Sequence, residues 1–531
     1  IVPGERYRVR NIRYLIEDSV VERIVREQAS LSSLQPGMPF DLNVLDGERS
    51  RISSRLQNSG YYKFNKEYVR FEADTCVGNQ KVDLDVVIPL YRASAESNPE
   101  LHRRYKIHSV SFSGDAAAFD TSRDTSRLDS MVYRGFPIYY KHKLAFRPSV
   151  FTNNNAIEPG HLYRERDVQR TYSNFGQLGA VMFSNIKMVE NDSLPNMLDG
   201  FVTVHENKPR SLGAELEGTN SAGDLGAALL TYQNRNLFRG SELLSLKLRG
   251  AFEAITGLEG YSDQNYMEIS VEAGLTFPNF RLFRFNGRDR GLMRATSEIS
   301  LLYDSQNRPE FHRRVLTSAL RYRWQSPNGL LRHRIDLIDL NYVFMPWISE
   351  TFRKDYLEDE TDRNAILRYN YENLFIMRLG YSFTYNSQRN ATSIADYGSN
   401  ALGIRFNVES AGNVLYGFSN LFGASRNDQG QYTLFNIAYA QYLKGDFDIS
   451  KSFRFDDRNS LALHFGIGVA YPYGNSTILP YEKRYFSGGA NSVRGWSVRE
   501  LGPGRFTGGD GRIDFINQTG DIKLDLNAEY R

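Results

Sequence analysis

The 531-residue sequence contains one cysteine, Cys76, and no apolar run as long as a membrane helix. A single cysteine excludes a disulfide bond within the chain and any CxxC metal-binding knuckle. A membrane helix needs ~18–20 consecutive apolar residues, so the missing run excludes a helical membrane protein. The formal net charge is only +3, which argues against nucleic-acid binding, because such proteins usually carry a basic surface.

The sequence also lacks the motifs that carry enzyme chemistry. His205-Glu206 is not followed by the second histidine of a zinc protease. Gly466-Ile467-Gly468 lacks the third glycine of a dinucleotide-binding loop, and no GxSxG nucleophile motif occurs. We therefore expect no enzyme activity, no catalytic residue, no metal and no cofactor.

Tyrosine and phenylalanine, by contrast, are abundant, with 33 of each against 3 tryptophans. Many aromatic residues without long apolar runs are typical of a membrane β-barrel. The length predicts several structural units, because single domains usually have ~100–200 residues. The sequence starts at Ile1 without a charged-then-apolar leader, so we expect any signal peptide or lipoprotein leader to have been removed.

Residues 1–95 predict one α+β module with the order strand, helix, helix, strand, strand. The expected strands are 7–16, 61–71 and 81–90, and the helices lie near 18–25 and 42–56. Asp18 is a suitable N-cap for the first helix, and Gly60 a suitable end for the second.

The same order recurs, less clearly, over residues 100–210. Strands are expected at 105–112, 181–190 and 198–206, with a helix at 164–178. A turn signal also repeats: Pro36-Gly37 is followed by Phe40, and Pro159-Gly160 by Tyr163. This predicts a duplicated module. The alternative is one ordinary α+β domain with a coincidental turn.

Residues 211–531 change to long alternating strands. In the clearest one, Met267, Ile269, Val271, Leu275 and Phe277 share a face opposite Glu268 and Glu272. We predict Glu268 and Glu272 towards the lumen and the apolar residues towards lipid. Twelve strands are expected, near 211–218, 224–233, 241–252, 264–277, 291–304, 312–325, 335–344, 372–386, 400–409, 432–443, 460–471 and 521–531.

Strands of about ten residues are long enough to cross a bilayer with tilt. The mean strand of a soluble protein has only ~5–6 residues. In lipid every backbone group must be paired, so such strands have to form a barrel. The pattern predicts an antiparallel transmembrane β-barrel, with a soluble all-β sandwich as the alternative.

One segment of the longest loop between strands carries a specific motif. Val493-Arg494-Gly495-Trp496 is preceded by Gly488-Gly489 and followed by Leu501-Gly502-Pro503. This pattern resembles the sixth extracellular loop of BamA/TamA-type outer-membrane assembly factors, whose hallmark is Val-Arg-Gly followed by an aromatic residue. The two N-terminal modules resemble POTRA domains, and residues 217–221 and 233–240 resemble the start of the barrel in the TamL-like branch.

The resemblance implies N-terminal α+β POTRA repeats followed by an antiparallel transmembrane β-barrel. Family barrels have sixteen strands, so about twelve would be present in this chain and the last four missing. The family often has three or more POTRA domains, whereas two are visible here. The chain is therefore expected to be partial.

The resemblance also implies the function. Such proteins assemble or insert other proteins into the outer membrane of Gram-negative bacteria, without ATP or a cofactor, with the POTRA domains in the periplasm. The implied partners are outer-membrane lipid, nascent outer-membrane proteins, and a periplasm-spanning TamB-like protein or accessory lipoproteins. Nucleic acid is not expected as a partner.

Two sites follow from the resemblance. Arg494 is expected to enter the barrel and pair with Glu529 on the last strand, although the spacing is one residue shorter than in the family. The alternative is a solvent-exposed loop arginine. The strand with Leu212, Gly213, Leu216 and Gly218 would border a lateral gate, because glycine weakens strand pairing. Alternatively, these glycines only ease barrel curvature.

Three other functions remain open at this point. A two-partner secretion translocator also has two POTRA domains, but it would usually carry an N-terminal plug helix, and none is visible before Tyr7. A passive porin or adhesin barrel has no reason to carry POTRA modules or the Val493–Trp496 motif. Lipid transfer together with a periplasm-spanning partner is compatible with TamA-like proteins.

Overall fold

The computed structural model describes residues 6–94, 96–114, 128–220, 224–254, 265–280, 294–326, 328–356, 373–388, 400–456, 459–489, 492–497, 499, 501–502, 504 and 519–531. The chain divides into two compact units, residues 1–207 and 208–531. Within these ranges no helix is long and apolar enough to cross a membrane.

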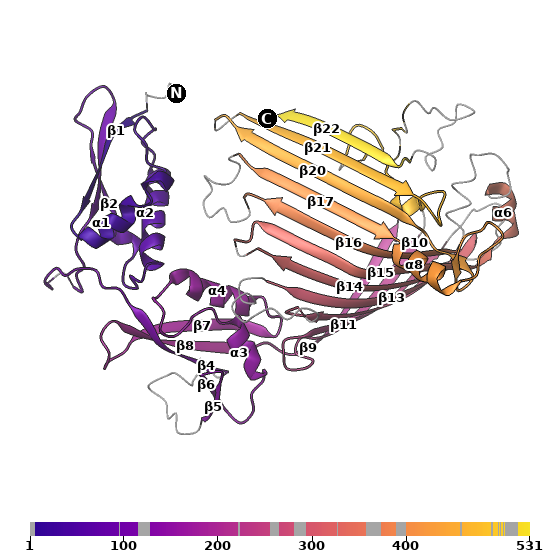
Figure 1. Ribbon diagram of the computed structural model, residues 1–531, viewed down its shortest axis with the longest axis horizontal. Helices are drawn as coiled ribbons and strands as arrows, with labels where there is room; N and C mark the ends of the chain where they lie inside the picture. Colours follow the sequence, from indigo (N-terminus) through magenta and orange to yellow (C-terminus); the bar gives the residue numbers. More distant parts are fainter. Residues whose placement is uncertain are drawn as a thin grey trace. The chain divides into compact units, whose positions relative to one another are not determined.

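The first module of the N-terminal unit has the predicted order of elements (Figure 1). β3 lies between β1, to which it is parallel, and β2, to which it is antiparallel. The Asp18 carboxylate accepts hydrogen bonds from the N–H groups of Val20 and Val21 and so caps the first helix. The elements are β1 (Arg8–Ile16), α1 (Ser19–Arg26), α2 (Leu42–Gln57), β2 (Arg70–Asp74) and β3 (Lys81–Ile88).

The expected strand at 61–71 is wrong for most of its length, because β2 starts only at Arg70. Tyr61 and Phe64 are buried in the core of the module, where they follow the end of α2. Asn65 then caps a short 3-10 helix, Lys66–Tyr68, by accepting from the N–H of Glu67. The aromatic residues therefore serve the core and not a strand.

The second module contains the same five elements plus an inserted hairpin, β5–β6, which the sequence did not predict. β4 is parallel to β8, and β7 is antiparallel to β8, as in the first module. The hairpin extends the sheet beyond β4. The elements are β4 (Lys106–Ser113), β5 (Asp129–Tyr133), β6 (Phe136–Tyr140), α3 (Pro148–Asn154), α4 (Glu165–Gly176), β7 (Val181–Glu190) and β8 (Met197–Glu206).

The two modules share local details that go beyond strand order. The N–H of Gly37 donates to the carbonyl of Val9 at 2.7 Å, and the N–H of Gly160 donates to that of Ile107 at 2.7 Å. Both glycines have positive φ, +89° and +82°. The register of β1 shifts directly after Val9, and that of β4 directly after Ile107. These shared features support a duplicated module.

Side chains join the two modules. The Tyr62 ring packs edge-on against the rings of Tyr105 and Tyr163, at 5.8 and 5.1 Å between centroids. Lys63 Nζ lies 2.6 Å from Glu190 Oε1, and this hydrogen bond raises the pKa of Lys63 above its usual value. The junction is therefore a packed interface and not a loose linker.

The second unit contains a twelve-stranded sheet in which every pair of neighbours is antiparallel, so the predicted number of strands is confirmed. Figure 1 shows a curved sheet with β9 and β22 at opposite margins. The strands are β9 (Arg210–Asn220), β10 (Asp224–Asn234), β11 (Leu243–Ala254), β12 (Tyr266–Phe277), β13 (Thr296–Asn307), β14 (Phe311–Gln325), β15 (Leu331–Ile348), β16 (Leu374–Asn386), β17 (Leu402–Ala411), β20 (Tyr442–Arg454), β21 (Ser460–Pro472) and β22 (Ile522–Tyr530).

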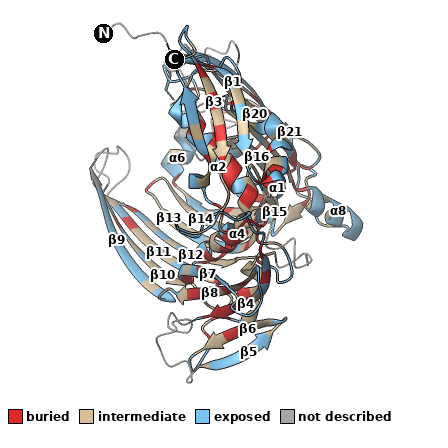
Figure 2. Ribbon diagram, turned by 90° about the vertical axis from the view of Figure 1, so that its left-hand side faces the viewer, coloured by how far each residue is buried: buried red, intermediate tan, exposed pale blue. Residues whose placement is uncertain are grey.

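One sheet face carries exposed apolar side chains and the other carries paired charges. Met267, Ile269 and Val271 of β12 are each about half exposed, whereas the carboxylates of Glu268 and Glu272 bind Arg249 and Lys247. The predicted division of these residues between two opposite faces is therefore confirmed, and their orientation towards lipid or lumen stays a prediction. Figure 2 shows exposed positions along the outer strands of the sheet. We call these two surfaces the outer and the inner face.

The expected strand at 432–443 is wrong. The sheet strand is β20, and the preceding chain forms α8 (Asn413–Phe422) and a small hairpin of β18 (Thr433–Leu434) and β19 (Ile437–Ala438). Phe435 and Asn436 have φ values of +53° and +61° and make the turn of that hairpin. Tyr432, Ile437 and Tyr439 are buried in a cluster with Phe375, which explains the apolar residues in this stretch. A further helix, α6 (Glu350–Tyr356), follows β15.

Candidate functional site

The first part of the long loop after β21 is bound to the inner face of the sheet. Its short 3-10 helix, Tyr481–Lys483, brings Lys483 Nζ to 3.5 Å from Glu409 Oε1 on β17. Glu482 pairs with Arg313 of β14 at 3.0 Å. Lys444 Nζ of β20 donates to the carbonyl of Lys483 at 2.9 Å. Three strands therefore fix this part of the loop.

Tyr485 is the central anchor of the loop. Its hydroxyl donates to Asp446 Oδ1 at 2.5 Å, and Lys444 Nζ lies 4.1 Å from the ring centroid. The ring rests on Gly468 of β21, where an added Cβ would lie only 2.6 Å from Tyr485 Cζ. The absence of a side chain at Gly468 thus leaves room for the loop.

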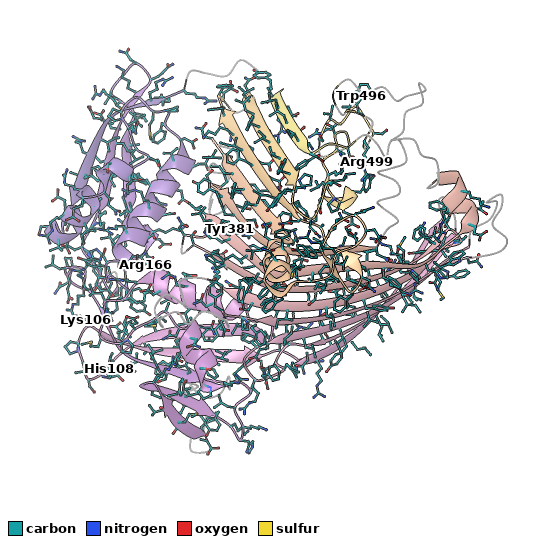
Figure 3. The ribbon with its side chains drawn as sticks, turned by 45° about the vertical axis from the view of Figure 1, so that its right-hand side comes forward. Lys106, His108, Arg166, Tyr381, Trp496 and Arg499 are labelled. Atoms are coloured by element: carbon teal, nitrogen blue, oxygen red, sulfur yellow. The ribbon has the colours of Figure 1, made fainter. Side chains whose placement is uncertain are left out.

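The motif itself forms a tight turn. Gly488 and Gly489 have φ values of +91° and +90°, and a Cβ on Gly488 would lie 2.1 Å from the Ser497 carbonyl oxygen. The N–H of Gly489 donates to the carbonyl of Trp496 at 2.8 Å. Val493 and Trp496 are 38 % and 50 % exposed. Figure 3 shows Trp496 and Arg499 on this segment.

Arg499, and not Arg494, contacts the aromatic side chains that precede the motif. Its guanidinium carbon lies 4.6 Å from the Tyr481 ring centroid and 4.9 Å from that of Phe486. Its backbone N–H also donates to the carbonyl of Ser487 at 2.9 Å. The loop motif did not predict a role for Arg499, and the only signal in the sequence was the presence of aromatic residues at positions 481 and 486.

The expected ion pair between Arg494 and Glu529 is absent from the described part of the chain. Glu529 instead pairs with Arg531, its neighbour on the same strand face, at 2.9 Å. Arg494 and Glu529 nevertheless line one cavity of about 1040 Å³ together with His464. Glu529 lies opposite Ala462 in the β21–β22 register. It therefore has the predicted inward orientation, and only its partner differs.

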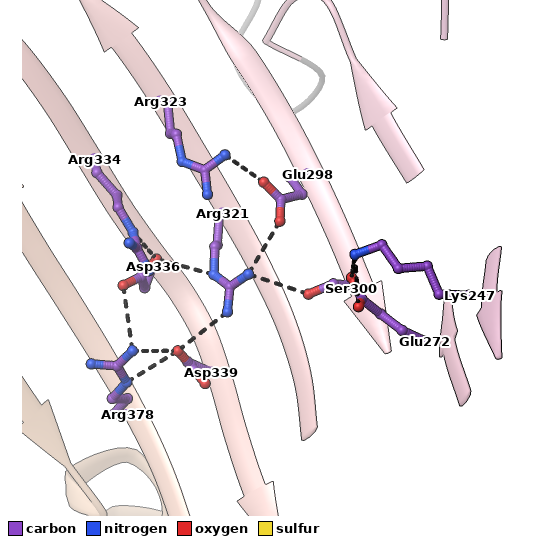
Figure 4. Close-up of polar contacts among 10 residues, drawn as sticks. All are labelled: Lys247, Glu272, Glu298, Ser300, Arg321, Arg323, Arg334, Asp336, Asp339 and Arg378. Atoms are coloured by element: carbon purple, nitrogen blue, oxygen red, sulfur yellow. Dashed lines mark hydrogen bonds and ion pairs between the residues drawn. The ribbon is translucent and has the colours of Figure 1, made fainter. Parts of the chain in front are cut away.

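A line of ion pairs crosses the inner face of the sheet (Figure 4). Lys247 of β11 pairs with Glu272 of β12 at 3.0 Å. Glu298 of β13 accepts hydrogen bonds from Arg321 at 3.1 Å and from Arg323 at 2.5 Å. Opposite charges on neighbouring strands stabilise the pairing of those strands.

The most buried part of this line is centred on Arg378 of β16. Its guanidinium lies 2.5 Å from Asp339 Oδ2, 2.5 Å from Glu409 Oε2 and 3.8 Å from Asp336 Oδ2. The three acidic residues are only 4–7 % exposed. Arg321 approaches Asp336 and Asp339 from the other side, at 3.6 and 3.8 Å. The buried carboxylates are therefore compensated by cations on both sides.

A β-bulge in β15 makes this arrangement possible. Residues three apart in a regular strand point to opposite faces. In the register with β14, Arg321 lies opposite Asp336 while Leu320 lies opposite Ile338, so residue 337 is extra. The bulge brings Asp336 and Asp339 onto the same inner face.

This cluster was not predicted from the sequence. Its charged residues occupy the polar positions of alternating strands, and that alternation was the only signal. Alternation assigns a face but does not assign a partner, because partners depend on register and on the bulge. Among the described residues no group of three or more His, Cys, Asp or Glu side chains could hold a metal ion.

The predicted gate strand is β9. It pairs with β10, and no partner on its other edge occurs in the described ranges. Leu212 and Leu216 are 71 % and 89 % exposed. An added Cβ on Gly213 or Gly218 would meet nothing within 4 Å. At these two positions the space above the sheet face is therefore open.

Similarities to solved structures include the following three, each of which covers a large part of the known chain. BamA from Haemophilus ducreyi lacking POTRA domains 1–3 is 12 % identical, with a TM-score of 0.47, covering 94 % of this chain and 77 % of that chain. CdiB from Acinetobacter baumannii is 10 % identical, with a TM-score of 0.40, covering 100 % of this chain and 77 % of that chain. POTRA domains 3–5 of Haemophilus influenzae BamA are 12 % identical, with a TM-score of 0.15, covering 39 % and 100 %.

No curated protein sequence matches this chain. The model of the Omp85 superfamily domain matches residues 349–531. This region contains β16, β17 and β20–β22, together with the long loop that carries the Val493–Trp496 motif. Two POTRA-like modules precede the twelve-stranded antiparallel sheet. Residues 349–531 thus match the Omp85 superfamily domain, and this matched region includes the loop motif that resembles BamA/TamA-type assembly factors.

Proposed function

We propose that this protein assembles or inserts other proteins into the outer membrane of a Gram-negative bacterium, without ATP and without a cofactor. The Omp85 superfamily domain supports this function. The TamL-like branch is part of the proposal and is supported by the sequence at residues 217–221 and 233–240.

The observation that supports the proposal most directly is the edge of β9. An edge strand presents unpaired backbone N–H and C=O groups to another chain. A nascent outer-membrane strand also has unpaired backbone N–H and C=O groups, so it can pair with the edge of β9 by strand addition. We propose that Leu212, Gly213, Leu216 and Gly218 lie at this seam, with the leucines towards lipid.

The N-terminal modules offer further edges. β2, β5 and β7 are outer strands of their sheets. We propose that they lie in the periplasm and bind unfolded clients in extended form before the clients reach β9. A periplasm-spanning TamB-like partner or accessory lipoproteins would act at the same modules.

We also propose that the motif loop is a structural element of the lumen, with Val493, Arg494, Gly495, Trp496, Gly488 and Gly489 shaping its turn. Arg494 shares a cavity with Glu529, and the short distances from Tyr485 to Asp446 and from Lys483 to Glu409 support Tyr485 and Lys483 as the primary anchors. Glu529 would then contribute a negative charge to the inner face beside the loop, and it would not be the residue that holds the loop in place.

The test is reconstitution of the chain into liposomes with a urea-denatured eight-stranded barrel protein as client. We expect the client to reach its heat-resistant folded form faster than in empty liposomes. A photoreactive cross-linker at Leu212 or Leu216 should capture the client. The same cross-linker at Leu248 of β11 should not capture the client. Leu248 is exposed as well, at 48 %, but its strand has a paired neighbour on both sides.

The outcomes separate the parts of the proposal. Unchanged folding of the client rejects the assembly function. Faster folding with equal cross-linking at 212 and 248 rejects the β9 seam only. Appearance of the client inside the lumen of the liposomes, without membrane insertion, favours a two-partner secretion translocator.

A further inference from the structure

The helix α8 exposes one entirely apolar face. Val414, Phe418, Leu421 and Phe422 are 51 %, 57 %, 79 % and 79 % exposed. They recur at the i, i+4, i+7 and i+8 spacing of a single helix face. Residues 413–422 include no Lys, Arg, Asp or Glu. Figure 2 shows α8 coloured as exposed along most of its length.

The opposite helix face binds the outer face of the sheet. Leu415 and Tyr416 pack on a cluster of Phe375, Tyr432, Ile437 and Tyr439. Phe375 and Met377 of β16 also contact this cluster and share a strand face with Leu379, which is 45 % exposed. The helix therefore lies on the side of the sheet that carries the exposed apolar residues, and not on the side of the ion pairs.

Specific contacts fix α8 in this place. The N–H of Gly412 donates to the carbonyl of Met377 at 2.9 Å, and a Cβ on Gly412 would lie 2.3 Å from the Ala440 carbonyl oxygen. The Tyr439 hydroxyl donates to Ser419 Oγ at 3.2 Å. The rings of Tyr416 and Tyr432 pack edge-on at 5.5 Å. The exposed face is thus held in one orientation by the sheet.

The strand order also shows at which end of the sheet α8 lies. Strands alternate in direction, so β17 ends, and β20 begins, at the end of the sheet opposite to the start of β9 (Figure 1). β9 follows directly on the N-terminal modules in the sequence. With those modules in the periplasm, α8 lies at the extracellular ends of the strands.

We propose that α8 is an interfacial membrane helix, whose apolar face inserts into the outer leaflet beside the barrel wall. A helix with an apolar face at the boundary of the acyl chains binds through its buried apolar area. Here the apolar face continues the lipid-facing surface of β15 and β16, where Ile338, Phe344 and Leu379 are 38–45 % exposed. The occupant is therefore lipid, because lipid already covers the adjoining surface.

This inference depends on the membrane position of the sheet and on the periplasmic modules, but not on the assembly activity. The segment between β17 and β20 would then anchor the neighbouring part of the sheet, β15 and β16, in the membrane. Phe435 of the β18–β19 hairpin, which is 76 % exposed, is a further exposed apolar side chain in the segment between β17 and β20.

The experiment uses the whole chain in phosphatidylcholine vesicles, with Cys76→Ser as background. Nitroxide labels are placed through Phe418→Cys and Leu421→Cys on the apolar face, Asn420→Cys at an exposed polar position that lies on neither the apolar nor the sheet-bound face, and Leu379→Cys on β16 as a lipid-facing reference. Collisions with oxygen, which concentrates in lipid, are compared with collisions with a water-soluble nickel complex. Heat-dependent gel mobility checks that each variant is folded.

We expect labels at 418 and 421 to collide several-fold more with oxygen than with the nickel complex, like the label at 379, and the label at 420 to show the reverse. If 379 is lipid-exposed and 418 and 421 are water-exposed, α8 is not in the membrane, although the sheet is. If both reagents are excluded from 418 and 421, protein covers the face and the inference is wrong. If 379 itself is water-exposed, the membrane position of the sheet fails as well.

Discussion

The aromatic ring of Tyr485 lies directly against the α-carbon of Gly468, so close that a single added methyl group would clash with it at 2.6 Å. Tyr485 belongs to the loop after β21 and Gly468 to β21 itself. The contact therefore couples the position of the loop to the size of one strand residue. The Tyr485 hydroxyl is fixed by Asp446, so the ring cannot move away without losing that hydrogen bond.

Gly468→Ala should therefore displace the loop from the inner face. Overpacking usually costs ~1–3 kcal/mol, and here it would also break the bond from Tyr485 to Asp446. We expect faster cleavage of the loop by protease, with the barrel still folded. Gly250→Ala of β11 is the matched control, because a Cβ there meets nothing within 4 Å. Equal cleavage in the two variants would contradict the anchoring role of Tyr485.

Arg378→Met should destabilise the sheet strongly. It would leave the buried carboxylates of Asp339 and Glu409 without their closest cation, and breaking a buried pair costs ~3–5 kcal/mol, or less in a hydrated lumen. The measurement is denaturant-induced unfolding of the chain in lipid vesicles. Arg405→Met on neighbouring β17 is the control, because Arg405 is exposed and makes no ion pair with a residue in the described ranges. If Arg378→Met lowers the free energy of unfolding no more than Arg405→Met does, the cluster does not stabilise the sheet.

Two adjacent leucines test the assignment of the sheet faces. Leu301 of β13 is 49 % exposed on the outer face, and Leu302 points inward opposite Glu272. Leu301→Arg should cost ~2–4 kcal/mol near the bilayer midplane, because the cation would face lipid. Leu302→Arg should cost less, because its guanidinium can reach Glu272.

The yield of folded protein in vesicles, measured by heat-dependent gel mobility, compares these two variants. The opposite order of yields would place the outer face in water, and equal yields would argue against a membrane-spanning sheet.

Asp199 makes the stability of the second module depend on pH. Its carboxylate is partly buried, which favours the neutral form, but it accepts hydrogen bonds from Ser109 at 2.5 Å, His108 at 2.8 Å and Asn191 at 2.7 Å. These bonds outweigh burial and lower the pKa of Asp199 below its usual value. The folded-state pKa is thus below the unfolded value of about 3.9. The stabilisation is present above that pH and disappears as the pH falls through the folded-state pKa.

Asp199→Asn should therefore destabilise the unit of residues 1–207 by ~1–2 kcal/mol at neutral pH, because the hydrogen bonds to the charged acceptor weaken. The difference from the unchanged protein should shrink at acid pH, as the pH falls through the lowered folded-state pKa of Asp199 and the carboxylate becomes protonated. Urea unfolding followed by circular dichroism at both pH values measures it. Asp192→Asn, at an exposed position nearby, should have little effect. A difference that is the same at both pH values would refute the role of the ionised carboxylate.

The sequence determined the order of elements in the first module and the faces of the long strands. The alternation in β12 assigned Ile269 and Glu268 to opposite faces, because side chains in a strand alternate with a period of two residues. The repeated Pro-Gly turns indicated the duplication, because each turn needs a glycine at a positive φ. The loop motif indicated the superfamily, because its glycines and arginine are specific in type and spacing.

Only the tertiary structure decided which of these residues meet. Arg494 and Glu529 were expected to pair, but they lie on separate segments whose approach depends on the packing of Tyr485 and Lys483. The strand expected at 432–443 has the apolar residues of a strand, and its contacts with Phe375 turn it into a hairpin on the outer face. The Arg378 cluster depends on the bulge after Asp336. Local periodicity fixes the direction of a side chain, whereas register, bulges and loop docking fix its partner.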